Sequence, residues 1–579
     1  MPSGSGPQEP GLPNYELARP TKRNAIIRRS NLSGALSVKA HCLPFSQIPH
    51  TTRLFTDLLA YSPKVQSFYP RSPFIGDWLK DAGSNASYDS SRRERVVSIL
   101  DRQNKSWSAS AQTVTNLDRL RKGALAVVTG QQVGLFGGPM FAIYKALTAV
   151  KLAEEATKAG VDAVPVFWLA TYDHDLAEVN HVSIPSAEGA PQLLATSSRS
   201  VAGAPVSAVR LGEEIVPVVE QAAALLGETE VTAILRECYR PGETLGTAFA
   251  RLYAKLFAES GVIVLDASDP ELHRVVEPIY RAAVERAGEL ETALLARGEA
   301  LEAAGYHQQV KVTSSSVLLF TLQNGARTAI HRRGNGENAE FVIGSDASAE
   351  TLTQAELLAR ISSSPELFSP NVLLRPIVED YLLPTLAYTG GAAEAAYFAQ
   401  AGAVYEHLLG RVTPIIPRFS ATIVEPKAQR MLEKFGMSVP DAFAGPDVLR
   451  RELAARSLPG DLQAAFDSAK LSLEQNFSTI KQKLSKLDPT LVDAAETAGS
   501  KMQYQLERLY TQAARAEAQK SELVTRKAEL LSHSLYPEKG LQERGIAGIY
   551  FIARYGRELL GQLQDAIHTD CHDHQILEL

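Results

Sequence analysis

The chain has 579 residues, of which 45% are hydrophobic and 21% charged, and its net charge is −6. This length is too great for one hydrophobic core and predicts roughly four domains of ~150 residues. The negative charge argues against a nucleic-acid partner, which would require a basic face. No apolar run approaches the roughly 18 residues that span a bilayer, so we expect no membrane partner.

The N-terminal residues and the cysteines indicate a location. Residues 1–30 have no apolar core of the kind found in a signal peptide, and we expect them to form a flexible arm. Cys42, Cys238 and Cys571 are far apart in the sequence and form no C-x-x-C pair. A disulfide framework is therefore not expected, and the reducing cytoplasm is the predicted location.

A β-α-β unit is the clearest local pattern. After a helical and loop-rich stretch at 31–122, an apolar run at 124–128 precedes several glycines, and Pro139 opens a helical pattern. A second apolar run follows at 164–170. Such crossovers are right-handed and leave both strands parallel. Ligands bind at the carboxyl ends of parallel strands, so we expect the functional site there.

The middle of the chain predicts further strands. Residues 182–212 suggest short strands and loops, and 261–266 is a continuous apolar run typical of a strand covered on both faces. Asp269-Pro270 predicts the start of a long helix that ends near Gly305. Residues 310–345 alternate polar and apolar side chains, which predicts antiparallel strands.

A second strand–glycine–helix turn lies at Gly390-Gly391, with a helix beginning near Glu394. Two such turns predict an α/β fold with a Rossmann-like, doubly wound core. We assign this core to 31–459, with insertions at approximately 190–258 and 306–365.

Residues 460–533 have a heptad pattern, which predicts an antiparallel α-helical coiled-coil arm. The alternative is one more helical face packed on the core. Asp488-Pro489 separates two helices, and residues 534–579 are expected to return to the core. The apolar positions are Phe466, Leu473, Phe477, Ile480, Leu484 and Leu487, then Leu491, Ala495, Ala498, Met502, Leu509 and Ala513.

The glycines after the first strand favour an anion site. Gly130, Gly134, Gly137 and Gly138 form neither a P-loop nor a G-x-G-x-x-G motif. Glycine nevertheless lets the backbone approach a ligand, and the N-terminus of the following helix attracts anions. Lys145 in this helix would suit a bound phosphate or carboxylate. The alternative is a tight structural turn with Lys145 in solvent.

An acidic cluster follows the second strand of the unit. Asp173, Asp175 and Glu178 repel one another unless a cation lies among them. A bound amine suits the cluster, with His174 as the general base and Asp173 and Asp175 orienting the ammonium. Alternatively, His174 is satisfied by hydrogen bonds at a strand end. The spacing, including His181, fits a metal poorly, and none is predicted.

Several other residues are weaker candidates. Arg375 could offer a bidentate fork to a carboxylate, or it could form a surface ion pair with Glu379 or Asp380. Arg418 and Lys427 are candidates of the same kind. The tail at 568–574, HTDCHDH, is similar to a metal-binding tract but is more typical of a solvated chain end.

Four segments carry a family resemblance. They are TGQQVGLFGGPMFAIYKALTAVKLAEEA (129–156), PVFWLATYDHDLAEVNH (165–181), NVLLRPIVEDYLLPTLAYTGGAAEAAYFAQ (371–400) and SLYPEKGLQERGI (534–546). From about residue 40 onward, the chain resembles the bacillithiol synthase family, which adds cysteine in bacillithiol biosynthesis. The resemblance implies a Rossmann-like core with two connecting-peptide insertions and a coiled-coil arm that supports a homodimer. It also implies the last pathway step, a ligase reaction that joins the cysteine carboxyl group to the amine of glucosaminyl malate.

The family's core is similar to class I synthetases and nucleotidyltransferases, whose H-x-G-H and K-M-S-K-S motifs are both missing from this sequence. Gly137-Gly138-Pro139 and Tyr144-Lys145 occupy the place of the first motif. Amide formation from a free carboxylate is uphill, so we expect ATP or another nucleotide as activator. The two alternative functions are a nucleotide-dependent transferase acting on another amine and a non-catalytic coiled-coil scaffold. The residues expected to bind substrate or nucleotide are Gln131, Gln132, Gly134, Gly137, Gly138, Tyr144, Lys145, Trp168, Glu178, His181, Arg375, Gly390 and Gly391.

Overall fold

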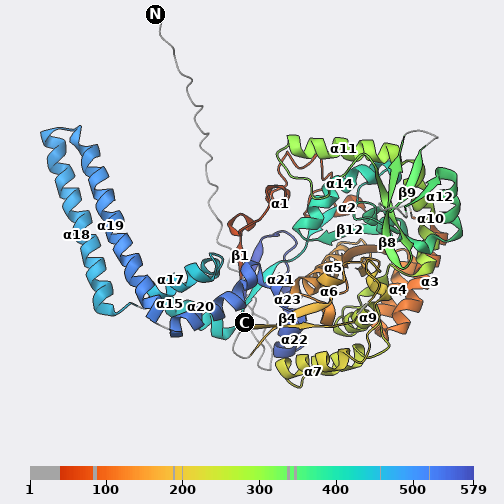
Figure 1. The fold of residues 1–579 in the computed structure, drawn as a ribbon, viewed down its shortest axis with the longest axis horizontal. Helices are drawn as coiled ribbons and strands as arrows, with labels where there is room; N and C mark the ends of the chain where they lie inside the picture. Colours follow the sequence, from red (N-terminus) through yellow and green to blue (C-terminus); the bar gives the residue numbers. More distant parts are fainter. Residues whose placement is uncertain are drawn as a thin grey trace, which may run out of the picture.

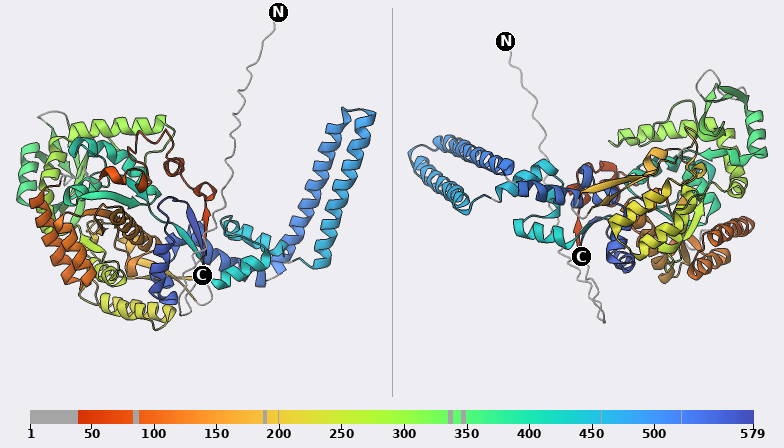
Figure 2. Two further views of the ribbon diagram at one scale, coloured as in Figure 1. Left: turned by 180° about the vertical axis from the view of Figure 1, so that it is seen from behind. Right: turned by 60° about the horizontal axis from the view of Figure 1, so that its bottom comes forward.

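The computed structural model describes residues 39–82, 88–186, 190–198, 200–334, 339–344, 349–456, 458–520 and 522–579. The predicted arm at 1–30 lies outside this part of the chain. An α/β body carries a long helical hairpin that projects away from it (Figure 1). Two further views show the same separation of body and hairpin (Figure 2). Among the described residues, no helix is both long and apolar enough to cross a membrane.

A five-stranded parallel sheet forms the centre of the body, in the order β13-β12-β2-β3-β6. In chain order, its strands are β2 Leu125–Gln131, β3 Ala163–Leu169, β6 Ile263–Asp266, β12 Thr385–Gly390 and β13 Ile415–Pro417. The chain therefore moves outward in one direction from β2 to β6, and then returns to the other side of β2. This reversal makes the boundary between β2 and β12 the switch point, where doubly wound folds bind ligands. The predicted Rossmann-like fold class is confirmed.

One helix follows each of the two strands at the switch point. The crossover between β2 and β3 is α5 (Met140–Lys158), and α14 (Ala392–Leu408) connects β12 to β13. Strand β3 is buried along its whole length, as expected of a central parallel strand. Before β2, the chain forms β1 Lys39–Leu43, α1 Arg53–Leu59, α2 Leu79–Ala82, α3 Ser90–Ser106 and α4 Ala111–Lys122.

Two segments interrupt the parallel sheet. Between β3 and β6 lie α6 Leu176–Val179, the antiparallel pair β4 His181–Pro185 and β5 Pro191–Ala195, and the helices α7 Ile215–Leu226, α8 Glu230–Cys238 and α9 Leu245–Leu256. The short strands predicted there are confirmed. The single long helix predicted after Asp269 is wrong. It divides into α10 Pro270–Glu285 and α11 Ala287–Ala303, because Arg286 leaves helical geometry at φ −106° and ψ 17°.

An antiparallel sheet forms the second interruption and confirms the strands predicted at 310–345. Its order is β10-β9-β8-β7-β11. Asn324 and Gly325, with φ of 52° and 80°, make the two-residue turn of the β7–β8 hairpin. The elements are β7 Ser316–Gln323, β8 Ala326–Arg333, β9 Glu340–Ile343, β10 Glu350–Thr353, α12 Gln354–Ser363, β11 Phe368–Pro370 and α13 Arg375–Leu382.

The C-terminal residues complete a third sheet instead of forming a solvated end. Strand β15 (His574–Glu578) lies between β1 and β14 (Ala421–Val424). His574 is fully buried and contacts the hydroxyls of Ser420 and Thr422. The prediction of a solvated tail is therefore wrong, because these residues are needed to fill the middle of a sheet.

The remaining elements are helical. The hairpin consists of α18 Gly460–Leu487 and α19 Leu491–Lys520, which confirms the predicted coiled-coil arm. It is joined to the body by α15 Pro426–Phe435, α16 Val439–Ala442, α17 Pro446–Ala455 and α20 Glu522–Leu535. The chain then returns to the body through α21 Gln542–Gly545, α22 Gly548–Tyr555 and α23 Glu558–Asp565.

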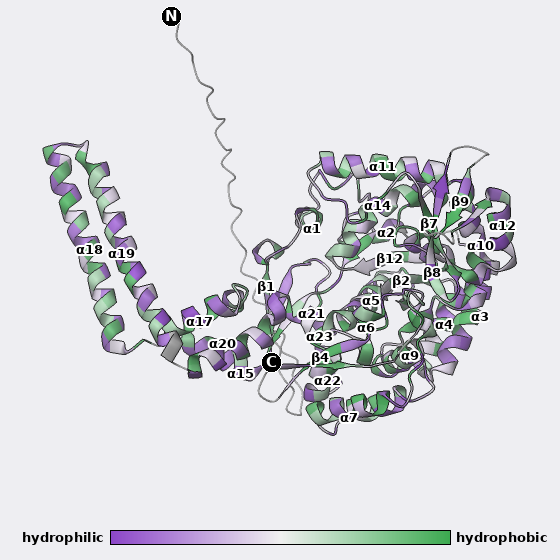
Figure 3. Cartoon of the chain, in the orientation of Figure 1, coloured by the Kyte–Doolittle hydropathy of each residue, from purple (hydrophilic) through white to green (hydrophobic). Residues whose placement is uncertain are grey.

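The predicted seam of the hairpin is only partly correct. Phe466 packs edge-on against Tyr510, with ring centroids 5.2 Å apart, and Phe477 lies against Gly499. By contrast, several predicted seam residues are exposed. Hydrophobic and hydrophilic segments alternate along both helices of the hairpin (Figure 3). A seven-residue repeat drifts around an α-helix with 3.6 residues per turn, and so cannot keep every repeat on one face without supercoiling. The exposed members are Ile480, Leu487, Leu491, Met502 and Leu509.

Candidate active site

A polar cavity of about 710 Å³ lies at the switch point of the parallel sheet. Gly130 and Gln131 reach it from the end of β2, Ala170 from the end of β3 and Gly391 from the end of β12. The antiparallel sheet supplies another wall through Phe320 and Arg327, and α21 supplies Arg544. The location matches the ligand site expected for this topology.

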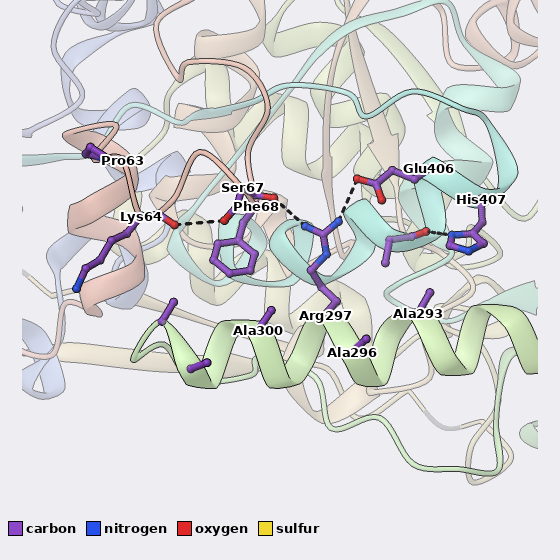
Figure 4. A pocket seen from close by; sticks show the side chains of 13 residues that line it. Pro63, Lys64, Ser67, Phe68, Ala293, Ala296, Arg297, Ala300, Glu406 and His407 are labelled. Carbon is purple, nitrogen blue, oxygen red and sulfur yellow. Dashed lines mark hydrogen bonds and ion pairs between the residues drawn. The ribbon is translucent and has the colours of Figure 1, made fainter.

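A second opening of about 680 Å³ lies between α11, α14 and the loop at 63–68 (Figure 4). Its floor is largely alanine. Its arginine is already paired: the Arg297 guanidinium contacts a Glu406 carboxylate oxygen at 3.0 Å and the Ser67 carbonyl oxygen at 3.0 Å. None of the sequence-predicted site residues lines this groove, and the cavity at the switch point is the stronger candidate site.

Lys145 and Glu394 form the centre of the switch-point cavity. The ammonium Nζ of Lys145 lies 2.7 Å from Glu394 Oε2 and donates to the Gly130 carbonyl at 2.7 Å. Burial lowers the pKa of Lys145 to about 8, although the charge of Glu394 opposes this. Lys145 is only 3% exposed, so the alternative that placed it in solvent is wrong. Its anionic partner belongs to the protein.

The turn at Gly390-Gly391 is built around the same carboxylate. The Gly391 N–H donates to Glu394 Oε2 at 2.8 Å and caps α14. A Cβ at Gly390 would lie 2.8 Å from the Glu394 Cβ, so a glycine is required there. Gly391 lines the cavity, whereas Gly390 does not.

Arg375, which lines the cavity, and Glu379 form a second pair. Arg375 Nη1 lies 3.3 Å from Glu379 Oε1, and Arg375 also donates to the Tyr397 hydroxyl. The pair is interior and not on the surface, because the Glu379 side chain is only 2% exposed. Burial raises the pKa of Glu379 to about 7 despite the nearby guanidinium. Gly130 lies directly against this pair, where a Cβ would be 3.1 Å from Arg375 Nη1.

Arg418 is also paired within the protein. Its Nη2 lies 2.6 Å from Glu543 Oε1, and both side chains are almost fully buried. Glu543 further accepts a hydrogen bond from the Ser420 hydroxyl at 2.9 Å. Burial alone would raise the pKa of Glu543, but the charge and hydrogen bond of Arg418 outweigh it and hold that pKa below its ordinary value. Lys427 is exposed on α15 and does not line the cavity.

Two arginines of the cavity have no carboxylate partner among the residues that the structure describes. Arg327 donates to the Ser369 hydroxyl at 3.0 Å and to the Pro370 carbonyl at 2.7 Å, with its guanidinium carbon 3.9 Å from the Phe320 ring centroid. Arg544 lies 5.8 Å from the Phe141 ring centroid. Burial lowers the pKa of both guanidinium groups. Guanidinium groups that line a cavity without a carboxylate partner favour an anionic ligand.

Asp173 and Glu178 form an acidic edge of the same cavity. The Gln132 side-chain amide donates to Asp173 Oδ2 at 2.9 Å and to Glu178 Oε2 at 3.0 Å, which holds the two carboxylates together. Asp175 is instead the N-cap of α6, accepting from the Glu178 N–H at 3.3 Å. Within the described residues, no group of three or more His, Cys, Asp or Glu is arranged to hold a metal ion.

His174 lies at the rim and not in the lining of the cavity. Its Nδ1 is 3.3 Å from Arg327 Nη1, and a guanidinium can only donate. The same nitrogen lies 3.6 Å from Asp173 Oδ1. His174 as the general base stays a prediction. His181 is exposed and contacts the Asn180 side chain at 3.1 Å.

The glycine turn after β2 does not reach the cavity. Gly137 has φ +88°, and a Cβ there would lie 3.1 Å from Leu252 on α9. The Tyr253 hydroxyl donates to the Gly137 carbonyl at 3.3 Å, and the Met140 N–H at the start of α5 donates to the Ile546 carbonyl at 2.9 Å. The turn is thus packed between protein elements, and an N–H group expected to face a ligand already has a partner. Gly134 and Gly138 belong to the same packed turn.

Only some of the residues predicted from the sequence line the cavity. Tyr144 and Trp168 are fully buried in the core and do not line the cavity. Arg327, Arg544 and Tyr397 were missed as site residues. The only signal for Arg544 was its position in the late SLYPEKGLQERGI segment. The predicted residues that do line the cavity are Gly130, Gln131, Gln132, Lys145, Asp173, Glu178, Arg375, Gly391 and Arg418.

The fold and the cavity define a class: a Rossmann-like α/β protein with a polar site at the switch point and a helical coiled-coil domain. Residues 38–419 match the family described as "Bacillithiol biosynthesis BshC, N-terminal Rossmann-like domain", and residues 421–579 match "Bacillithiol biosynthesis BshC, C-terminal coiled-coil domain". The chain belongs to the BshC family.

Curated relatives agree with this assignment, and each is named "Putative cysteine ligase BshC". The protein of Koribacter versatilis is 48% identical over 93% of this chain and 99% of the relative. Those of Solibacter usitatus and Salinibacter ruber are 37% and 34% identical, each over 93% of this chain and over 99% and 98% of the relative.

Proposed function

We propose that this chain is a cysteine ligase that joins L-cysteine to the amine of glucosaminyl malate, the step that completes bacillithiol. Membership of the BshC family supports the reaction class. One structural observation carries the assignment of the site: Arg327 and Arg544, which have no carboxylate partner in the described chain, line the same cavity as the Asp173–Glu178 edge. Such a cavity suits a substrate with both negative and positive groups.

The arginines suit the malate end of the amine substrate. Malate carries two carboxylates, and a guanidinium offers each a charge-assisted fork. The other arginines of the cavity, Arg375 and Arg418, already contact carboxyl groups of the protein, those of Glu379 and Glu543. Arg327 and Arg544 are therefore proposed to bind the dicarboxylate, while Arg375 holds the wall behind it.

The acidic edge suits the amine. An ammonium group must lose a proton before it can attack a carboxyl carbon, so a base is required. Asp173 lines the cavity and is held in place by Gln132, whereas the His174 ring lies at the rim. Asp173 is proposed to orient the ammonium and accept its proton, with Glu178 adding negative charge beside it.

A nucleotide is proposed as the activator, and it would supply the leaving group that a free carboxylate lacks. The site lies where Rossmann-like sheets bind nucleotides, while its two guanidinium groups without a carboxylate partner are assigned to the malate end. The packed glycine turn offers no phosphate cradle. The chain's own part is to bind both substrates, exclude water and move the proton through Asp173.

The hairpin is proposed to form a homodimer. Ile480, Leu487, Leu491, Met502 and Leu509 are exposed on its two helices. A second copy is the natural cover for apolar stripes on a coiled coil. A cytoplasmic location is proposed as well, since a reducing compartment suits the three free cysteines.

The test is a reconstitution. The purified chain is incubated with cysteine, glucosaminyl malate and each nucleoside triphosphate in turn, and products are identified by mass. The proposal expects an amide whose mass is the sum of both substrates less one water, formed only when a nucleotide is consumed. An amide formed with a different amine alone would favour the transferase. If no ligand gives a product or raises the thermal midpoint of the protein, the scaffold is favoured instead.

A further inference from the structure

Two thiols from distant parts of the chain lie in contact. Cys42 Sγ is 3.7 Å from Cys571 Sγ, although 529 positions separate the two residues. The antiparallel pairing of β1 with β15 places Cys42 opposite Gln575, and the segment entering β15 brings Cys571 alongside. Cys42 is exposed and Cys571 partly exposed, so small reagents can reach both.

The environment makes one sulfur the more reactive. A hydrogen bond from the Cys42 thiol lowers the pKa of Cys571 to about 7, against burial and the charges of Asp570 and Asp573. The same contact raises the pKa of Cys42. Thiolates, and not thiols, attack disulfides, and a thiol with a pKa near the ambient pH attacks fastest.

The third cysteine provides an internal reference. Cys238 is fully buried, and burial raises the pKa of its thiol to about 12. It therefore has neither the access nor the thiolate form that reaction requires.

We propose that Cys42 and Cys571 form a dithiol site that exchanges with the disulfides of low-molecular-weight thiols. The choice of that reactant class rests on the proposed function, because the product of the reaction is itself a small thiol. When small disulfides accumulate, they would oxidise this dithiol, so the protein proposed to produce the small thiol would respond to the oxidation state of that thiol.

The exchange proceeds in two balanced steps. The Cys571 thiolate attacks one sulfur of a small disulfide R–S–S–R, a Cys571–S–R bond forms, and RS⁻ leaves and takes up a proton. Cys42 then gives up its proton and attacks Cys571 Sγ, and the second RSH leaves. Two protein thiols are oxidised to one disulfide while one small disulfide is reduced to two thiols. The sulfurs need only close from contact to the bond length of about 2.05 Å.

The bond would act close to the candidate active site. Cys571 lies three positions before His574, whose ring contacts the Ser420 hydroxyl at 2.8 Å. Ser420 donates to Glu543, and Glu543 holds Arg418 in the cavity wall. Joining Cys42 to Cys571 would fix the start of β15 against β1, and so stabilise the strand that supports this chain of contacts.

The test uses the full reduced chain and glutathione disulfide, with intact mass and peptide mapping as readouts, so it does not depend on ligase activity. The expected result is a mass loss of 2 Da, a Cys42–Cys571 cross-linked peptide, an unmodified Cys238 and full reversal by dithiothreitol. Cys42→Ser is expected to stop at a mixed disulfide on Cys571, and Cys571→Ser is expected to form neither product. Far-UV circular dichroism checks that both variants are folded.

Two outcomes would overturn the site. One is an unchanged mass after prolonged exposure to excess glutathione disulfide. The other is a stable mixed disulfide on the wild-type chain that never closes onto Cys42. If the site forms as expected but the reconstitution gives no amide, the dithiol stands and the proposed ligase function fails.

Discussion

Lys145 and Glu394 meet across the switch point of the parallel sheet, with 2.7 Å between Nζ and Oε2. Lys145 comes from α5, which follows β2, and Glu394 from α14, which follows β12. The pair therefore joins the two halves of the doubly wound core at the place where the substrate is proposed to bind. A buried pair of this kind gives position more than net stability.

Removing the lysine tests the pair. Lys145→Met leaves a buried, uncompensated carboxylate and is expected to lower the free energy of unfolding by about 3–5 kcal/mol. Lys151→Met on the same helix is the matched control, because its contact with Glu155 is 3.8 Å and more exposed. That change is expected to cost less than about 1 kcal/mol. Urea unfolding of both variants is the measurement, and equal losses would contradict the assignment.

Two glycines on either side of the same turn are expected to behave differently. Gly130→Ala would push a Cβ against Arg375, and is expected to lower kcat/KM about 10- to 100-fold through a displaced cavity wall. Gly137→Ala would strain a residue at φ +88° and is expected to cost about 1–3 kcal/mol of stability. Steady-state kinetics and thermal unfolding separate the two effects. A loss of substrate affinity in folded Gly137→Ala would restore the glycine turn as a binding element.

Glu379 predicts a pH dependence of stability. Its pKa is about 7 in the folded protein, against an ordinary value of 4.5. Below pH 4.5 both folded and unfolded chains hold the proton, and between 4.5 and 7 the folded chain alone holds it. The free energy of unfolding therefore falls as the pH rises through this window, by up to about 3 kcal/mol from this group.

Glu379→Gln isolates that contribution because the amide does not titrate. Urea unfolding from pH 4.5 to 8 is expected to show the wild type losing stability relative to the variant until about pH 7, after which the difference becomes constant. If the two stability curves stay parallel throughout, the carboxyl group does not hold its proton in the folded protein.

Arg544 is expected to control affinity for the malate group. Arg544→Gln removes a charged donor and is expected to raise KM for glucosaminyl malate about 10- to 100-fold, with no change in KM for cysteine. Arg526→Gln on α20 is the control, since the Arg526 side chain is 72% exposed and lies outside the cavity. An equal rise in KM for both substrates would indicate general damage to the site.

The hairpin residues predict the oligomeric state. Ile480→Lys combined with Met502→Lys places charges on two exposed apolar positions, which are 43% and 52% exposed. We expect the double variant to sediment as a monomer while keeping its helical circular dichroism, and the wild type to sediment as a dimer. Gln475→Lys, also exposed on α18, is the control and is expected to leave the mass unchanged.

Much of the fold could be predicted because local sequence patterns determine its strands, turns and helices. The apolar runs of β2, β3 and β6 and the two glycine turns indicated the parallel sheet. The heptads indicated the hairpin. The residues of the hairpin seam were harder to predict. Ile480 and Met502 fit the seven-residue repeat, but this repeat drifts around a helix with 3.6 residues per turn, and both side chains are exposed.

The site was less predictable, for two physical reasons. The glycines of 134–138 indicate a turn, but the sequence does not reveal which face of the turn packs on α9. Arg544 and Arg327 are separated from β2 by hundreds of residues, and only the three-dimensional fold brings them to its carboxyl end. The sequence also contained no indication that Lys145 forms an ion pair with Glu394.

Strand β15 also sets an order of events during synthesis. Its partner β1 ends at Leu43, whereas β15 begins at His574, so β1 emerges from the ribosome long before any strand can pair with it. At translation rates of about 5–20 residues per second, this delay is roughly half a minute to two minutes. β1 has no sheet partner during that time, and β14 has none from its own synthesis until β15 arrives, so both strands leave backbone groups open to pairing with another chain.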